Sequence, residues 1–129
     1  MSIIDSLAPL QQALNYHLER QTLLTANLAQ VDTPGYKAQD LYRTDEGSFE
    51  GTLELALSSS GDAEAAAPAA SPWEVRHDPY APLGPDGNSV SLDRESVKIA
   101  TNNLRYDAIS SMIRIRLDDL RYAAQDGKG

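Results

Sequence analysis

Two histidines are the residues best able to do chemistry in this chain. His77 lies in the segment Arg76-His77-Asp78-Pro79. A His–Asp pair can serve in a catalytic triad, but no Ser or Cys nucleophile motif accompanies it. His17 lies within an apolar stripe and has no second His or Cys nearby, so a packed helix residue is the simpler interpretation. A small helical enzyme built on either histidine is therefore the weakest functional hypothesis, and we expect no catalytic, metal or cofactor site.

The composition of the chain narrows its function further. The 129 residues include no cysteine, which excludes disulfides and thiol chemistry. The net charge is −8, and residues 45–95 alone hold 11 acidic and two basic residues. There is no basic footprint for nucleic acid, and no run of about 18 apolar residues that would span a membrane. The first ten residues lack the basic and apolar regions of a secretory signal, so we expect no cleaved signal peptide.

The N-terminal segment has the pattern of a long amphipathic helix. Between residues 3 and 31, apolar side chains recur every three or four positions, close to the period of coiled coils. We predict a helix over 8–31, capped by Asp5 or Ser6, with Pro9 in its first turn. Thr33-Pro34-Gly35-Tyr36 then ends it, because Pro and Gly suit the central positions of a type II turn. The expected seam consists of Leu7, Leu10, Leu14, His17, Gln21, Leu24, Leu28 and Val31.

The C-terminal segment predicts a second helix over 93–124, with Asp93 as its N-cap directly after Leu92. Two apolar seams run along it, and two seams require two packing partners. The N-terminal helix can cover one seam, so the other requires another subunit. The first seam is Val97, Ala100, Leu104, Ala108, Met112 and Ile115; the second is Ile99, Tyr106, Ile109, Ile113, Leu117, Leu120 and Ala124.

Three asparagines stand out within the helical segments: Asn27, Asn102 and Asn103. An Asn that is buried in a helical seam can set the register of the pair at a cost in stability. The sequence thus offers candidate register residues in both helices.

The middle of the chain, residues 38–89, is irregular in pattern and rich in Pro and Gly. Residues 58–72 are small or acidic and have little to bury, so we expect them to stay mobile. Short strands are compatible with Thr52–Leu57 and with Val75 and its neighbours, and Asp86-Gly87-Asn88 is a turn signal.

These patterns predict a mainly all-α fold in three regions. Residues 1–37 and 90–129 form two long helices packed as a helical hairpin or coiled-coil layer, and residues 38–89 form a partly disordered middle. Of the 27 Leu, Ile, Val and Phe residues, 20 lie in the two terminal regions. We therefore expect the hydrophobic core to be shared with other chains.

The end of the first helix carries the most specific motif. Residues 27–37, Asn-Leu-Ala-Gln-Val-Asp-Thr-Pro-Gly-Tyr-Lys, resemble the N-terminal signature of the flagellar axial proteins that build rod and hook. In that signature Asn-Leu-Ala-Asn leads into Thr-Pro-Gly-Tyr, and Gln30 replaces the second Asn. Residues 40–42, 86–95, 103–106, 120–122 and 127–128 resemble the proximal rod members of the family. The signature and assembly residues are then Asn27, Leu28, Thr33, Pro34, Gly35, Tyr36, Leu92, Asp93, Asn103, Leu104, Tyr106 and Leu120.

This resemblance implies a structural subunit of the proximal rod in the flagellar basal body. Such proteins are exported through the flagellar type III apparatus without a cleaved signal, and they polymerise in the periplasm through their terminal helices to transmit torque. The implied partners are other copies of the chain, other rod proteins, the junction protein at the inner-membrane ring and the export machinery. The helix-seam residues expected to pack are Leu7, Leu14, Leu24, Val97, Ile109, Ile113 and Leu117.

A cytosolic helical adaptor or secretion chaperone is the main alternative. Such a protein would be a stable dimer with a cooperative melting transition. A rod subunit would instead be monomeric, and partly disordered at its ends, until it polymerises.

Overall fold

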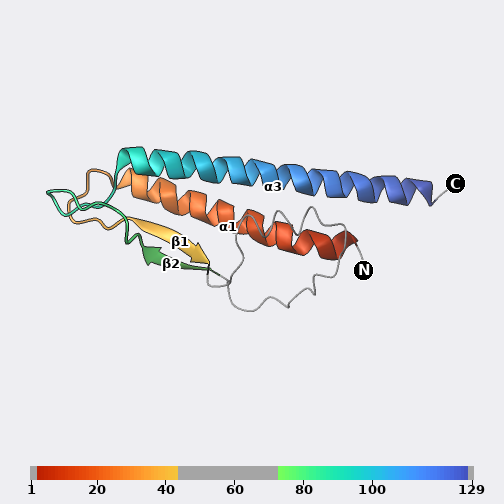
Figure 1. The fold of residues 1–129 in the computed structure, drawn as a ribbon, viewed down its shortest axis with the longest axis horizontal. Helices are drawn as coiled ribbons and strands as arrows, with labels where there is room; N and C mark the ends of the chain where they lie inside the picture. Colours follow the sequence, from red (N-terminus) through yellow and green to blue (C-terminus); the bar gives the residue numbers. More distant parts are fainter. Residues whose placement is uncertain (1–2, 44–72, 128–129) are drawn as a thin grey trace.

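A computed structural model describes residues 3–43 and 73–127 of the chain. Its elements are the helix α1 (Ile3–Ala29), the strands β1 (Gln39–Arg43) and β2 (Trp73–His77), and the helix α3 (Leu92–Asp126). The two helices lie side by side and antiparallel, and the two strands form an arm beside α1 (Figure 1). The predicted class is confirmed, because two long terminal helices dominate the fold.

The helix pair is held by an aliphatic cluster near the N-terminus of α1. Leu10 and Ala13 of α1 and Ile109 of α3 are almost fully buried there. Burying a Leu or Ile side chain contributes roughly 2 kcal/mol by removal of apolar surface from water. The half-buried side chains that pack around this cluster are Leu7, Leu14, Met112 and Ile113.

The arm is a two-stranded antiparallel sheet. Gln39 pairs with His77 and Arg43 with Trp73, so β1 and β2 are in register along their whole length. β1 carries the buried residues Asp40 and Leu41, whereas β2 is exposed apart from a half-buried Trp73. The arm is therefore attached to the helix pair through β1.

The chain turns out of α1 as the sequence predicts. Gly35 has φ +75°, and the Tyr36 amide donates to the Thr33 carbonyl, as in a four-residue turn with Gly in third place. A Cβ added at Gly35 would meet no atom within 4 Å, so only its backbone conformation restricts the residue. Left-handed backbone costs an ordinary L-residue about 1 kcal/mol. Gly87, in the predicted Asp86-Gly87-Asn88 turn, also has a positive φ, of +79°.

Two predictions about the helix ends are wrong. α1 begins at Ile3, so Pro9 lies inside the helix rather than in its first turn. α3 begins at Leu92 with Ser91 as its N-cap residue, and no side chain bonds to that end. The Ser91 carbonyl accepts a hydrogen bond from the Glu95 amide. Asp93 lies exposed in the first turn of the helix. There its negative charge still faces the positive end of the helix dipole.

The two described parts of the middle region, residues 38–43 and 73–89, contain two strands and hydrogen-bonded turns. The strand at Val75 is confirmed as β2, but its partner β1 was not predicted. Residues 78–91 are also placed, and they connect β2 to α3 around the end of α1. The predictions for Thr52–Leu57 and for residues 58–72 lie outside the described residues.

Candidate assembly site at the turn end

Asn27 is the centre of the contacts that hold the turn end together. It lies near the C-terminal end of α1 with none of its side chain exposed. Its amide group donates to the Gln39 carbonyl at 2.6 Å and to Glu95 Oε2 at 3.2 Å. Its carbonyl oxygen accepts from the Gln39 amide and the Tyr36 hydroxyl, both at 3.1 Å. One side chain thus joins α1, the turn, β1 and α3.

Asn88 closes the end of α1 from the other side. Its side-chain amide donates to the carbonyls of Gln30, Val31 and Thr33 at 2.7–3.0 Å. These carbonyls follow the last helical turn and have no partner within the helix. The Asn88 side-chain oxygen accepts from the Val90 amide at 2.7 Å. A loop residue 58 positions from Gln30 in sequence therefore caps the N-terminal helix.

Further hydrogen bonds fasten the loop to the turn. The Gly35 amide donates to the Asp86 carbonyl and the Ser89 amide to the Tyr36 carbonyl. The Ser89 hydroxyl accepts from the Ala38 amide at 2.7 Å. The turn is thus anchored by backbone groups of residues that the irregular middle supplies.

Gln30, which replaces the usual Asn of the signature, forms its own contact. Its side-chain oxygen accepts from the Thr33 hydroxyl at 2.6 Å. The longer side chain reaches forward into the turn, and the contact stays on the exposed side of the site. The substitution therefore keeps a side-chain hydrogen bond at the helix end.

A second group of buried polar residues lies between the two helices, seven residues further along α3 than Glu95. Asn102 of α3 is fully buried and accepts from His17 Nδ1 at 2.7 Å. Its amide group donates to the His17 carbonyl at 2.7 Å and to Gln21 Oε1 at 3.2 Å. Because the Asn102 oxygen must accept, the His17 proton is assigned to Nδ1. Glu95, Asn102 and Ile109 are spaced by seven residues, so they occupy the same seam of α3.

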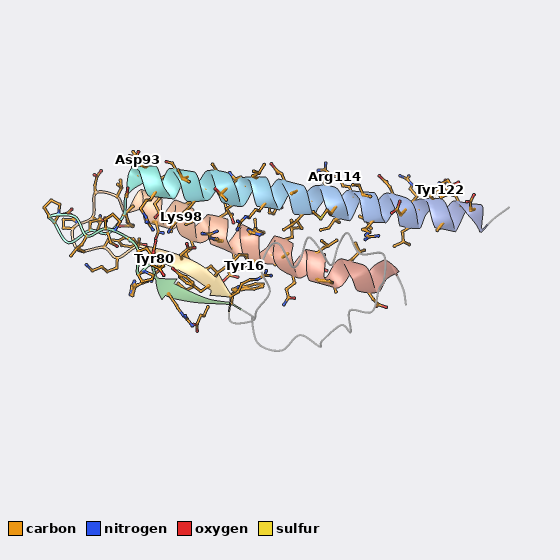
Figure 2. The ribbon with its side chains drawn as sticks, in the orientation of Figure 1. Tyr16, Tyr80, Asp93, Lys98, Arg114 and Tyr122 are labelled. Atoms are coloured by element: carbon orange, nitrogen blue, oxygen red, sulfur yellow. The ribbon has the colours of Figure 1, made fainter. Side chains whose placement is uncertain are left out.

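A chain of ion pairs attaches the arm to both helices. Arg20 of α1 forms a two-bond pair with Asp40 at 2.8 and 2.9 Å. Lys98 of α3 lies between Asp40, at 3.3 Å, and Asp78, at 2.6 Å. Arg94 adds a 2.8 Å bond to Asp78. Figure 2 shows Lys98 where α3, the end of α1 and the arm come together.

Electrostatics favour the ionised state of these groups. Burial by itself raises the pKa of the Asp40 carboxyl, but hydrogen bonds and charge from Arg20, with Lys98 nearby, hold that pKa below its ordinary value. Asp78 shows the same balance, with burial opposed by Lys98 and Arg94, and its pKa is also lowered. Burial by itself lowers the pKa of Lys98, but Asp78, Asp40 and Glu95 raise it by more, so the pKa lies above its ordinary value.

Aromatic contacts complete the attachment of the arm. The Tyr16 hydroxyl donates to the Leu41 carbonyl at 2.8 Å, and its ring meets Trp73 edge to face at 5.6 Å. Trp73 Nε1 donates to Glu19 at 2.7 Å. Arg43 lies over the Tyr16 ring at 4.9 Å. The arm is therefore pinned along the middle of α1 as well as at its end.

The face of α3 turned away from α1 carries exposed large apolar side chains, with the exposed Asp118 and Asp119 beside them near its C-terminal end. Val97, Leu104, Ile115 and Tyr122 are each between 61% and 71% exposed. Intervals of seven and eleven residues return to the same side of a helix, so these side chains form one stripe. Tyr122 lies close to the far end of α3, at the opposite end of the molecule from the arm (Figure 2). We call these four residues the outer stripe.

The structure brings some predicted residues together and separates others. Asn27 and Tyr36 meet at the turn end, while Leu24, Ile109 and Ile113 pack between the helices with Leu7 and Leu14. Asn102 is buried, whereas Asn103 is exposed and takes no part in the seam. Leu28, Tyr106 and Leu120 are half-buried. The exposed members of the predicted set are Thr33, Pro34, Gly35, Leu92, Asp93, Val97, Leu104 and Leu117.

Sequence reasoning missed Asn88, Ser89, Asp40, Asp78 and Glu95, all of which are buried. These residues lie in or beside the segment that its composition marked as irregular. The available signal was the polar run Asp86-Gly87-Asn88-Ser89, which predicted a turn but not a helix cap.

Neither histidine occupies a reactive site. His17 is buried within the helix seam and bonded to Asn102, while His77 lies exposed at the end of β2. Within residues 3–43 and 73–127, no three His, Asp or Glu side chains gather as metal ligands would. No helix in that part of the chain is long and apolar enough to cross a membrane.

Together, the paired terminal helices, the capped turn and the outer stripe define an elongated helical protein of the kind that assembles with other chains. No protein-family model matches the chain. The "Flagellar basal body rod protein FlgB" of Escherichia coli (strain K12) is 32% identical over 125 residues, covering 91% of each chain. The proteins of that name from Salmonella typhimurium (33%, 91% of each) and Cereibacter sphaeroides (32%, 92% of this chain and 93% of the relative) are equally similar. The chain belongs to the FlgB family of flagellar basal-body rod proteins.

Proposed function

We propose that the chain is a proximal rod subunit that the flagellar type III apparatus exports, and that it polymerises through its two terminal helices to transmit torque. Family membership supports a structural role in the basal-body rod. The observation that carries the assembly mechanism is the outer stripe. Four large apolar side chains exposed in one line on α3 are costly in water and are typical of a protein interface.

The remaining features suit a subunit that transmits force. The turn end is fixed by buried hydrogen bonds and ion pairs, which resist sliding of one helix against the other. The partners in this proposal are other copies of the chain, other rod proteins, the junction protein at the inner-membrane ring and the export machinery. The location in this proposal is the periplasmic rod.

A charge on the outer stripe tests this function. Leu104→Glu should leave the helical circular dichroism of the purified chain intact, because Leu104 is 71% exposed. In a strain deleted for the gene, the variant should be exported but should not restore rods or swimming. Ser96→Glu is the matched control, since it adds the same charge at an exposed position of α3 outside the outer stripe and should restore motility. Full motility with Leu104→Glu would contradict assembly through this face.

A further inference from the structure

α1 also has an exposed face without any charge. Its members, all exposed, recur every three or four residues: Ala8, Gln11, Asn15, Leu18, Thr22, Ala26 and Ala29. We call them the neutral stripe. Leu18 is 55% exposed, and most of the other side chains are small.

The lack of charge on this stripe is unusual for a helix surface in water. Charged residues make up 23% of the chain, and the exposed face of a solvated helix normally carries them. Between residues 8 and 29 only Glu19 and Arg20 are charged, and both bond to the arm, Glu19 through Trp73 and Arg20 through Asp40. The face therefore has the character of a surface that packs against protein.

The two stripes point in opposite directions. On α1, the residues that face α3 are Leu10, His17 and Leu24, and the neutral stripe lies more than a quarter turn from them. On α3, the outer stripe also lies more than a quarter turn from Asn102 and Ile109, the residues that face α1. Each copy thus presents large apolar side chains on one side and small neutral ones on the other.

We propose that the outer stripe of α3 in one copy packs on the neutral stripe of α1 in the next copy, an inference that rests on the proposed function. A rod grows only through a heterologous contact, because two identical faces that pair with each other close a dimer and stop growth. Large residues against small ones also allow two helices to approach closely, as ridges fit grooves.

The lengths of the two stripes agree with this pairing, and their small contact area requires that the contact be repeated. Val97 to Tyr122 spans about 38 Å at 1.5 Å per residue, and Ala8 to Ala29 spans about 32 Å. A strip of that length and about 10 Å in width offers roughly 350 Å² on each partner, well below the about 800 Å² of a stable interface. A single pair of copies is therefore weak, and the contact holds only when it is repeated on both sides of each subunit.

Cysteine cross-linking in isolated basal bodies tests the pairing. The chain has no cysteine, so the introduced thiols are the only ones on this protein. Thr22→Cys lies in the neutral stripe, and Ala108→Cys, at a half-buried position, lies between Leu104 and Ile115 of the outer stripe. Both sites are away from the helix ends, which makes the test less sensitive to helix direction. With a short bismaleimide, the double variant should give dimers, trimers and longer products of the chain. Each single variant should give no chain-to-chain product. A second pair, Asn15→Cys with Ser111→Cys, samples the same faces if the first pair fails to restore motility.

Asp107→Cys combined with Thr22→Cys is the control, because residue 107 is exposed on α3 but lies beside the stripe, and it should cross-link several-fold less. Dimers from Ala108→Cys alone would show that α3 meets α3 and would overturn the pairing. Rods that assemble without any link between the two stripes would also overturn it while leaving the proposed function intact. Absence of the unmodified chain from purified basal bodies would overturn both.

Discussion

At the turn end of the helix pair most of the buried side chains are polar, whereas at the open end they are aliphatic. Asn27, Asn88 and Glu95 hold the first region through hydrogen bonds to named atoms. Leu10, Ala13 and Ile109 hold the second by contact alone. Aliphatic contact tolerates a shift of one heptad, but a buried amide does not, because the shift would leave its donors and acceptors unpaired. The turn end therefore sets the register of the two helices, and the aliphatic contacts at the open end add stability to the pair.

The largest expected effect is from Asn27→Ala. The change leaves the Gln39 backbone groups and the Tyr36 hydroxyl without the Asn27 side chain and removes one donor from Glu95, at a cost of about 4 kcal/mol in the free energy of unfolding. Trp73 is the single tryptophan and lies on the arm, so its fluorescence reports the arm while circular dichroism reports the helices. In urea, the fluorescence change should precede loss of helix. Coincident transitions would show that Asn27 does not hold the arm separately. Asn15→Ala, at an exposed position, is the control.

Leu10→Ala tests the other end of the comparison. Removing a fully buried Leu should lower the free energy of unfolding by about 3 kcal/mol, because a cavity remains beside Ile109. Both spectroscopic signals should then shift together to lower urea concentration, since the change weakens the pair without touching the arm. Leu18→Ala, 55% exposed, should shift them by less than about 0.5 kcal/mol. Equal effects of the two changes would mean that the pair is not held at Leu10.

The smallest effect is a dependence on pH at the layer between the two regions. Burial lowers the pKa of His17 below 6.5, and the positive charges of Arg105, Arg20 and Arg43 act in the same direction. The unfolded chain therefore binds more protons below pH 6.5, so this contribution to stability is complete above that pH and is lost as pH falls toward the lowered pKa. Loss of the Asp40 and Asp78 contributions follows at still lower pH, because their pKa values are lowered from 3.8.

Urea midpoints measured between pH 7.5 and 5 check this dependence. His17→Gln should flatten the profile over that range, whereas His77→Gln, at the exposed end of β2, should not change it. A slope that persists in His17→Gln would assign the titration to another group.

Local patterns in the sequence were enough to predict the two helices and the turn. The recurrence of Leu10, His17 and Leu24 defined the inner face of α1, and Pro34-Gly35 defined where the chain leaves it. The prediction that one seam of α3 stays uncovered within the chain also follows from periodicity alone. These features depend on neighbours within a few positions, so the sequence carries them directly.

Contacts between distant residues were decided only by the tertiary structure. Three contacts depend on how segments 20 to 85 residues apart fold onto one another. Asn88 bonds the end of α1, Asn102 rather than Asn103 enters the seam, and Lys98 joins Asp40 to Asp78. A polar residue in an irregular segment has the same local signature whether it faces water or a helix end. The sequence by itself determined the two helices, the turn after the first helix and which face of each helix is apolar. The tertiary structure decided which polar groups are buried, because hydrogen-bond partners are chosen by position in space.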